Sequence, residues 1–130
     1  MKERMDVFFD SFAEKMPEQL EQLRKEALEA GNPVIRMQTA RLLKVLLSLH
    51  KPEQILEIGT AVGFSALWMN SCAPDAQITT IEKVDVRIKE ATENFKRFGK
   101  EDQITLLAGD ALEILKELTG PYAFVFLDAA

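Results

Sequence analysis

Short apolar runs alternate with helical patterns from residue 54 onward, and this alternation constrains the fold more than any other feature of the chain. The runs are rich in β-branched and aromatic residues and span 54–58, 77–81, 103–107 and 122–127. Strands that alternate with helices are joined by right-handed crossovers into a parallel sheet with helices on both faces. The sequence therefore predicts an α/β, doubly wound fold with strand order 3-2-1-4, in which a helix from Asp110 carries Leu112, Leu115 and Leu118.

The chain before this region has a helical pattern only. Apolar residues at helical spacing predict helix over residues 3–30, with a restart at Pro17 and a stop at Gly31. A third helix follows, with Met37, Ala40, Leu43 and Leu47 on one face. We divide the chain into a helical segment, 1–32, and a ligand-binding sheet domain, 33–130. The stripe Phe8, Phe9 and Phe12 is interpreted as core, or alternatively as the interface of a homodimer.

Composition excludes several classes of protein. The 130 residues include 16 basic and 21 acidic side chains, which gives a net charge of −5. This charge argues against a protein that binds nucleic acid through electrostatic attraction alone. The single cysteine, Cys72, fits a reducing compartment. No apolar run approaches the ~20 residues of a membrane span, and the first residues lack a secretory pattern. The expected location is the cytoplasm.

The end of the first strand carries the most informative turn. Parallel sheets bind ligands beyond the carboxyl ends of their strands, and here Gly59 and Gly63 allow a tight turn and a close approach of the backbone. The helix that follows offers free N–H groups to a carboxylate or a phosphate. A dinucleotide fingerprint would need glycine where the chain has Ala61 and Phe64, so NAD is disfavoured. A purely structural turn remains the alternative.

The other three strands end in carboxylates. Glu82 lies about twenty residues after the glycine turn, where an acid can accept the ribose hydroxyls of a nucleoside; the alternative is a helix N-terminal charge. Asp110 could accept from an exocyclic amine such as that of adenine, and could also cap a helix. Asp128 emerges from an apolar strand, which favours binding of a hard cation such as Mg²⁺, although one carboxylate is too few ligands.

These four strand ends, in this order, resemble those of class I S-adenosylmethionine-dependent methyltransferases. More narrowly, the chain resembles the cation-dependent O-methyltransferases of catechol and caffeoyl-CoA type and their bacterial relatives, some of which methylate 5-hydroxyuridine in tRNA. The resemblance covers about residues 33–130 and implies a Rossmann-like sheet. It is carried by the segments 55–65, 80–82, 109–111 and 126–130.

The resemblance implies a cofactor, a cation and a reaction. S-adenosylmethionine would donate its sulfonium methyl in line to a substrate hydroxyl, and a bound Mg²⁺ or similar ion would lower the pKa of that hydroxyl. Ser65 is similar to the hydroxyl that binds the methionine carboxylate, and Asp128 is similar to the first metal ligand. The implied cofactor-binding residues are Ile35, Glu57, Gly59, Gly63, Ser65, Glu82, Asp110, Ala111 and Asp128.

The chain departs from this family at its end. The catalytic lysine expected after Asp-Ala-Ala lies beyond Ala130, as do two further metal ligands and three strands, so the catalytic residue is unassigned. We expect this to be the N-terminal portion of a roughly 210-residue enzyme and the 130-residue chain to be inactive. The acceptor is a small catechol-like molecule or tRNA. The rival hypothesis is a non-catalytic nucleoside-binding or scaffolding module.

The remaining singled-out residues are interpreted as structural. His50 is expected in a solvated loop, Cys72 as a small core residue, and Trp68 as packing rather than a stacking platform. One predicted helix carries basic residues that could steer RNA, namely Lys83, Arg87, Lys89, Lys96 and Arg97. The acidic residues interleaved with them, Asp85, Glu90 and Glu93, favour a plain exposed face instead.

Overall fold

The computed structural model describes residues 4, 5, 7 and 15–128, so the predicted Phe8–Phe12 stripe lies outside the described residues. Helices α2 (Glu18–Glu29) and α3 (Met37–His50) precede the sheet. The sheet region comprises β1 (Gln54–Ile58), α4 (Phe64–Cys72), β2 (Gln77–Glu82), α5 (Asp85–Arg97), β3 (Ile104–Ala108), α6 (Ala111–Ile114) and β4 (Phe124–Leu127). Among the helices that can be described, none has the length and apolar character to cross a membrane.

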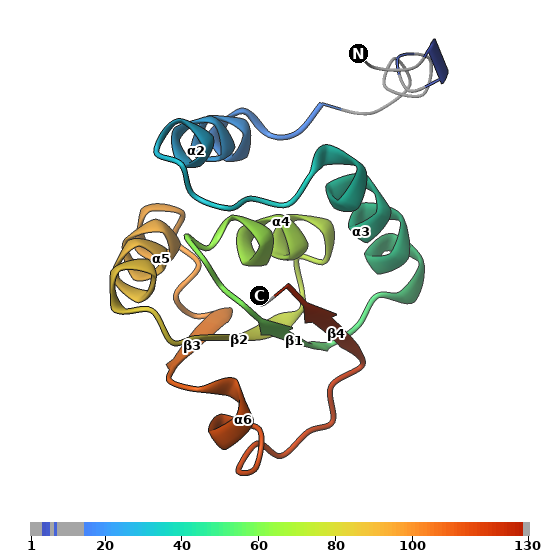
Figure 1. Ribbon diagram of the computed structural model, residues 1–130. Helices are drawn as coiled ribbons and strands as arrows, with labels where there is room; N and C mark the ends of the chain where they lie inside the picture. The colour runs from blue at the N-terminus through green and yellow to red at the C-terminus, as the bar shows by residue number, and fades with distance from the viewer. Residues whose placement is uncertain (1–3, 6, 8–14, 129–130) are drawn as a thin grey trace.

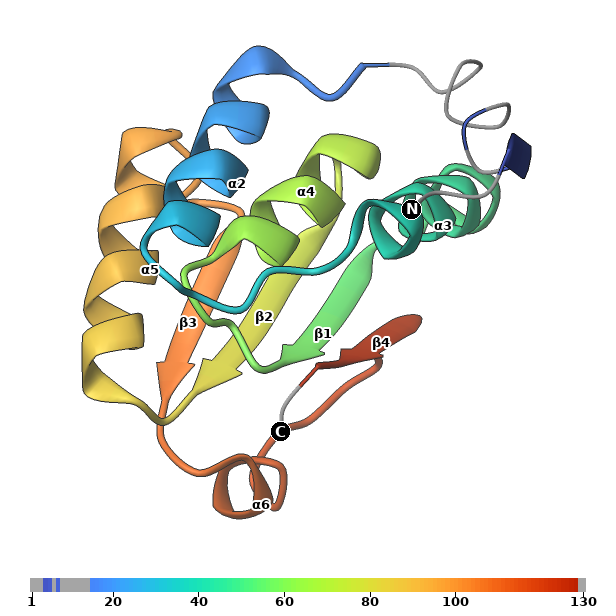
Figure 2. The ribbon, with the colours of Figure 1, turned by 45° about the horizontal axis from the view of Figure 1, so that its top comes forward.

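The four strands form one parallel sheet in the order β3-β2-β1-β4 (Figure 2). The predicted fold class and strand order are therefore confirmed. At the centre of the sheet Glu57 on β1 is aligned with Thr80 on β2 and with Phe126 on β4. Aligned residues of parallel strands share a face, so the register decides which side chains meet.

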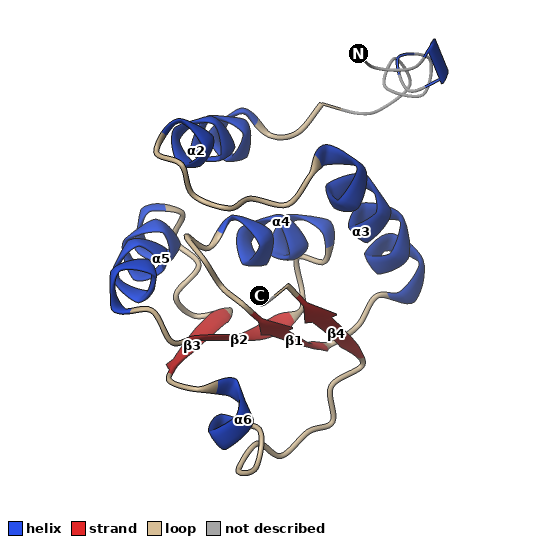
Figure 3. Ribbon diagram, in the orientation of Figure 1, coloured by secondary structure: helices blue, strands red, loops and turns tan. Residues whose placement is uncertain are grey.

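Helices cover the two faces of the sheet unequally. Helices α3, α4 and α5 lie on one face, α2 lies outside α4 and α5, and the short α6 lies on the opposite face (Figures 1 and 3). Ile55, Ile78 and Ile104 are buried in the core on the helix-rich face. On the opposite face of β4, Val125 is 52% exposed and Leu127 is 69% exposed. The sheet is thus well packed on one side and thinly covered on the other side near β4.

Helix α2 joins this core directly. Its buried residues Leu20, Leu23 and Ala27 belong to the same hydrophobic cluster as α4. The helix ends as predicted, because Gly31 adopts a left-handed φ of 76° and the N–H of Asn32 donates to the carbonyl of Ala27 at 2.9 Å. A glycine stop of this kind satisfies carbonyls that the last helical turn would leave unpaired.

Trp68 links α3 to α4. Its side chain is 5% exposed, and the indole Nε1 donates to the carbonyl of Ala40 at 2.7 Å. Ala40, Leu43 and Leu47 form the buried face of α3, as the spacing predicts. The packing role predicted for Trp68 is confirmed.

Two local predictions are wrong. The helix predicted to run from Asp110 to Leu118 ends at Ile114, and Leu112 is 75% exposed. Helices in proteins are stabilised mainly by burying an apolar face, and apolar spacing alone does not supply a surface to pack against. His50 is the last residue of α3 rather than part of a loop, and its Nε2 lies 3.0 Å from the carbonyl oxygen of Ala123.

Candidate functional site

A cleft of about 960 Å³ lies at the carboxyl ends of the strands. Its walls come from all four strand ends and from the segment that leads into α3. Six of the nine predicted cofactor-binding residues line it: Ile35, Gly59, Glu82, Asp110, Ala111 and Asp128. Carboxyl ends of parallel strands meet at one edge of a sheet, which is why residues from distant parts of the chain converge here.

The other three predicted residues lie around this cleft rather than on its walls. Ser65 lines a smaller pocket next to it, and Gly59, Ile35 and Asp128 line both. Gly63, at the end of the glycine turn, and Glu57, on β1, are both buried. Ligand binding by all nine residues stays a prediction.

The glycine turn is held in place by Glu82. The Oε1 atom of Glu82 accepts from the N–H of Ala61 at 2.9 Å, and Oε2 accepts from the N–H groups of Lys83 and Val84 at 3.0 and 3.1 Å. Ala61 has a φ of 49°, a conformation that a residue with a Cβ seldom adopts. The carboxylate therefore fixes a strained turn while its own side chain is only 6% exposed.

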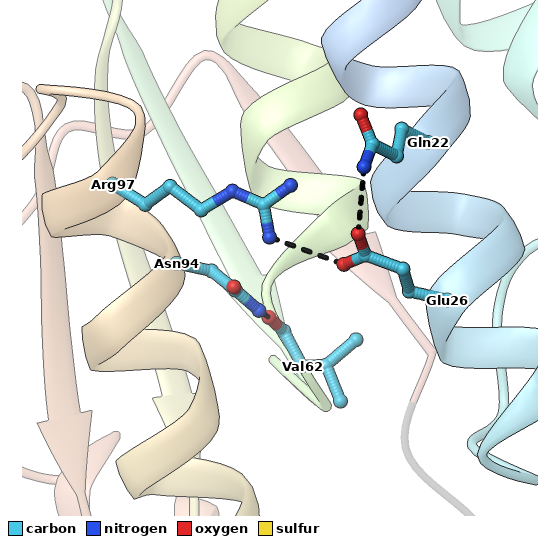
Figure 4. Close-up of polar contacts among 5 residues, drawn as sticks. All are labelled: Gln22, Glu26, Val62, Asn94 and Arg97. Carbon is cyan, nitrogen blue, oxygen red and sulfur yellow. Dashed lines mark hydrogen bonds and ion pairs between the residues drawn. The ribbon is translucent and has the colours of Figure 1, made fainter.

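Neighbouring elements hold the same turn from the other side. The N–H of Gly59 donates to the carbonyl of Ile81 at 2.9 Å, and the Nδ2 of Asn94 on α5 donates to the carbonyl of Val62 at 2.8 Å (Figure 4). Asn94 is not among the residues predicted from sequence. The available signal was a polar residue directly before the buried Phe95 on the inner face of α5.

Helix α2 is tied to α5 beside this contact. The guanidinium of Arg97 lies 3.1 Å from Glu26, which also accepts from Gln22 at 3.1 Å (Figure 4). These side chains are exposed to solvent, and exposed ion pairs contribute little to stability. Their effect is to align α2 with α5, while the buried leucines of α2 supply the packing.

Gly63 is needed for packing rather than for space around a ligand. A Cβ atom at this position would lie 2.7 Å from Cε1 of Phe95 and 3.5 Å from Cα of Ala91. The residue also has a φ of 92°, which disfavours any side chain. Gly63 thus lets the start of α4 approach α5 closely.

We expect Gly63→Ala to lower the free energy of unfolding by about 2–3 kcal/mol, from backbone strain plus the clash with Phe95. Gly99→Ala is the matched control, because Gly99 has a φ of 65° with no atom within 4 Å of an added Cβ. The control should lose only about 1 kcal/mol. Urea denaturation of both variants measures the difference, and equal losses would contradict the packing argument.

Glu57 is fully buried and bonded to hydroxyls. Thr80 donates to its Oε1 at 2.7 Å, Ser65 donates to its Oε2, and Thr60 lies 2.6 Å from the Thr80 oxygen. Burial raises the pKa of Glu57 to about 7, and the bonds from Ser65 and Thr80 oppose that rise. Glu57 is therefore connected to the smaller pocket by Ser65 on one side and by Thr80 and Thr60 on the other.

The remaining two carboxylates have different surroundings. Asp110 caps α6 as predicted, since its Oδ1 accepts from the N–H of Leu112 at 2.8 Å. Asp128 is exposed at the end of β4, and partial desolvation raises the pKa of its carboxyl. Within the described part of the chain, no group of three His, Cys, Asp or Glu side chains is arranged to hold a metal ion. Asp128 alone does not fit a divalent cation.

Cationic side chains also line the cleft. Arg36 precedes α3, Lys83 directly follows β2, and Arg87 lies in the first turn of α5. None of the three is among the site residues predicted from sequence, and Lys83 and Arg87 were expected on a solvated face. Their charges offset those of Glu82, Asp110 and Asp128 around the same cavity.

A parallel sheet of this order, with a glycine turn after β1 and a buried acid at the end of β2, places the chain in the Rossmann-like class of α/β proteins. A comparison with sequence models of protein families identifies one family within this class. The sequence model of the O-methyltransferase family matches residues 10–130, and the chain belongs to that family.

Similar proteins include several catechol O-methyltransferases. The chain is 32% identical over 108 residues to the catechol O-methyltransferase of Niastella koreensis, covering 78% of this chain and 49% of that protein. It is 31% identical over 106 residues to the catechol O-methyltransferase of Mycobacterium tuberculosis, covering 80% and 48%. The chain thus spans about half the length of the curated relatives it matches.

Solved structures give the same result for the fold. The SAH-bound methyltransferase PaMTH1 of Podospora anserina superposes with a TM-score of 0.84 at 30% identity, covering 97% of this chain and 56% of that chain. The O-methyltransferase TomG of Streptomyces achromogenes, in complex with SAM, superposes with a TM-score of 0.79 at 30% identity, covering 96% and 59%. SAM is S-adenosylmethionine, and SAH is its demethylated product.

Proposed function

We propose that the protein is a SAM-dependent O-methyltransferase and that this chain supplies the cofactor-binding cleft. The observation that carries the proposal is the convergence of Glu82, Asp110 and Asp128 with the glycine turn on one cavity of about 960 Å³. The volume suits a ligand of nucleoside-plus-amino-acid size. Family membership and the SAH-bound and SAM-bound neighbours support the same ligand.

The residues of the cleft suit the two ends of SAM differently. Glu82 would accept from the ribose hydroxyls, and Asp110 would accept from the adenine amine with the carboxylate oxygen that does not cap α6. The amino-acid end would lie near Gly59, Ser65 and Asp128, which line the smaller pocket. When bound, SAM supplies an electrophilic methyl group on sulfur, and the protein contributes orientation and the exclusion of water.

The acceptor we propose is a hydroxyl of a catechol-like molecule, as the names of the relatives suggest. The cationic side chains at the cleft, Arg36, Lys83 and Arg87, favour an anionic acceptor as the second candidate, for which tRNA 5-hydroxyuridine is the example. Transfer of a labelled methyl group from SAM to each acceptor, with a protein of the relatives' length, separates the two. We propose no step through a cation, because the residues that can be described do not form its site.

Calorimetry with SAH tests the cofactor assignment on the 130-residue chain. We expect saturable binding of one SAH per chain, and no binding of NAD, since Ala61 and Phe64 replace the glycines of a dinucleotide turn. Absence of saturable SAH binding would contradict the proposal and favour a scaffolding role. Adenosine serves as a second ligand, which should bind more weakly because it lacks the amino-acid end.

A further inference from the structure

The fully buried carboxyl of Glu57 has no role in the proposed function as stated so far. The side chain is 0% exposed and its hydrogen-bond partners are hydroxyls of α4 and β2. The charged groups that act on it are both acidic, Glu82 on β2 and Asp128 on β4. A buried charge without a cation is costly, so the position calls for an explanation.

The directions of the hydrogen bonds around Glu57 are fixed by the number of hydrogens. Each hydroxyl has one hydrogen to donate. Thr80 donates its hydrogen to Glu57, so in the contact with Thr60 it must accept. Ser65 also donates its hydrogen to Glu57. The Oγ of Ser65 therefore presents only lone pairs to the small pocket while Glu57 is ionised, so in that state a ligand carboxylate can accept only from the backbone N–H groups at the start of α4.

We propose that Glu57 is a positioning residue that takes up one proton when the carboxylate end of the cofactor binds beside Ser65. This inference rests on the proposed function. A proton from solvent adds to Oε2 of Glu57, the new O–H donates to Oγ of Ser65, and the Ser65 hydrogen turns to the ligand carboxylate. No covalent bond other than this O–H bond forms. The amino-acid end of the ligand is a zwitterion and brings no net charge, so the proton taken up by Glu57 reduces the negative charge near Glu82 and Asp128 by one.

The pKa of Glu57 lies close enough to neutral pH that protonating it there costs little free energy. Burial raises its pKa to about 7, bonds from Ser65 and Thr80 lower it, and the charges of Asp128 and Glu82 raise it. When Ser65 turns away, one lowering contribution is lost, and the pKa of Glu57 rises further. Above its pKa in the free protein, Glu57 must gain a proton for the ligand to bind, so affinity should fall about tenfold per pH unit.

Calorimetry of SAH binding to the 130-residue chain tests the inference. At about pH 8, in two buffers that differ in ionisation enthalpy, we expect uptake approaching one proton per SAH bound. Binding without proton uptake would overturn the inference and leave the proposed function standing. Failure of SAH to bind at any pH would instead overturn the proposed function, so the two failures are distinguishable.

Two variants separate proton coupling from a merely structural role. Glu57→Gln mimics the protonated acid, because its amide can donate to Ser65 permanently; it should bind SAH without proton uptake and with little dependence on pH. Thr80→Val removes one donor to Glu57, so its pKa should rise and the fall in affinity should begin at higher pH. A structural role alone would weaken binding equally at every pH in both variants, which would overturn the proposal.

Discussion

Replacing Glu82 by alanine is expected to weaken SAH binding by at least about a hundredfold and to lower the free energy of unfolding by about 3 kcal/mol. The carboxylate would lose its proposed ribose hydrogen bonds, and the N–H groups of Ala61, Lys83 and Val84 would lose their acceptor. Because Ala61 has a left-handed φ, the glycine turn would also lose the contact that holds it in a strained conformation. Calorimetry and urea denaturation measure the two effects.

Asp110→Ala is the control for this prediction. Asp110 also lines the cleft, but its side chain accepts from a single backbone N–H, that of Leu112. Loss of that cap should cost about 1 kcal/mol or less and should leave the glycine turn unchanged. If Glu82→Ala binds SAH as tightly as the native chain does, the ribose role of Glu82 is wrong.

Trp68→Ala is expected to lower the free energy of unfolding by about 4 kcal/mol, the largest effect on stability that we predict. The indole is buried between α3 and α4, and its removal would leave a large cavity and an unpaired carbonyl at Ala40. Trp68→Phe retains most of the packing and loses the hydrogen bond, so it should cost about 1–2 kcal/mol. Thermal or urea denaturation measures both.

The matched control is Leu49→Ala, on the outer face of α3. Leu49 is 80% exposed, and substitutions at exposed positions usually change stability by less than about 0.5 kcal/mol. A loss for Trp68→Ala no larger than that of Leu49→Ala would show that the α3–α4 contact does not stabilise the fold.

Much of the fold could be predicted from sequence because its signals are local. Glycine and proline mark the ends of α2 and β1, and the alternation of short apolar runs with helical patterns specifies a parallel sheet. A helix is expected after the glycine turn, and α4 begins at Phe64, directly after Gly63. The same local rules failed for α6, where apolar spacing was present but Leu112 and Leu115 had no surface to pack against.

The site residues also differ in whether local sequence signals could predict them. The strand ends could be predicted to converge, because a parallel sheet brings its carboxyl ends together. The partnership of Glu57 with Thr80 could not be, since it depends on the register of β1 against β2, and Asn94 reaches Val62 only through the packing of α5. The sequence indicates that position 63 needs a glycine for the turn. It does not indicate that a side chain there would clash with the ring of Phe95, because Phe95 lies 32 residues away in the chain.

The position of β4 gives the two walls of the cleft different local stabilities. Among the described strands β4 pairs with β1 alone, its outward residues Val125 and Leu127 are exposed, and it leads to Asp128. Within the described part of the chain it can therefore separate from the sheet in a sub-global opening that leaves β1, β2 and β3 paired, at a free energy below that of complete unfolding. The wall formed by Glu82 is buried between neighbouring strands, so it opens only with the core. Among the described residues, the cleft thus combines a wall at Glu82 that has the stability of the whole fold with a wall at Asp128 that has the stability of a single strand.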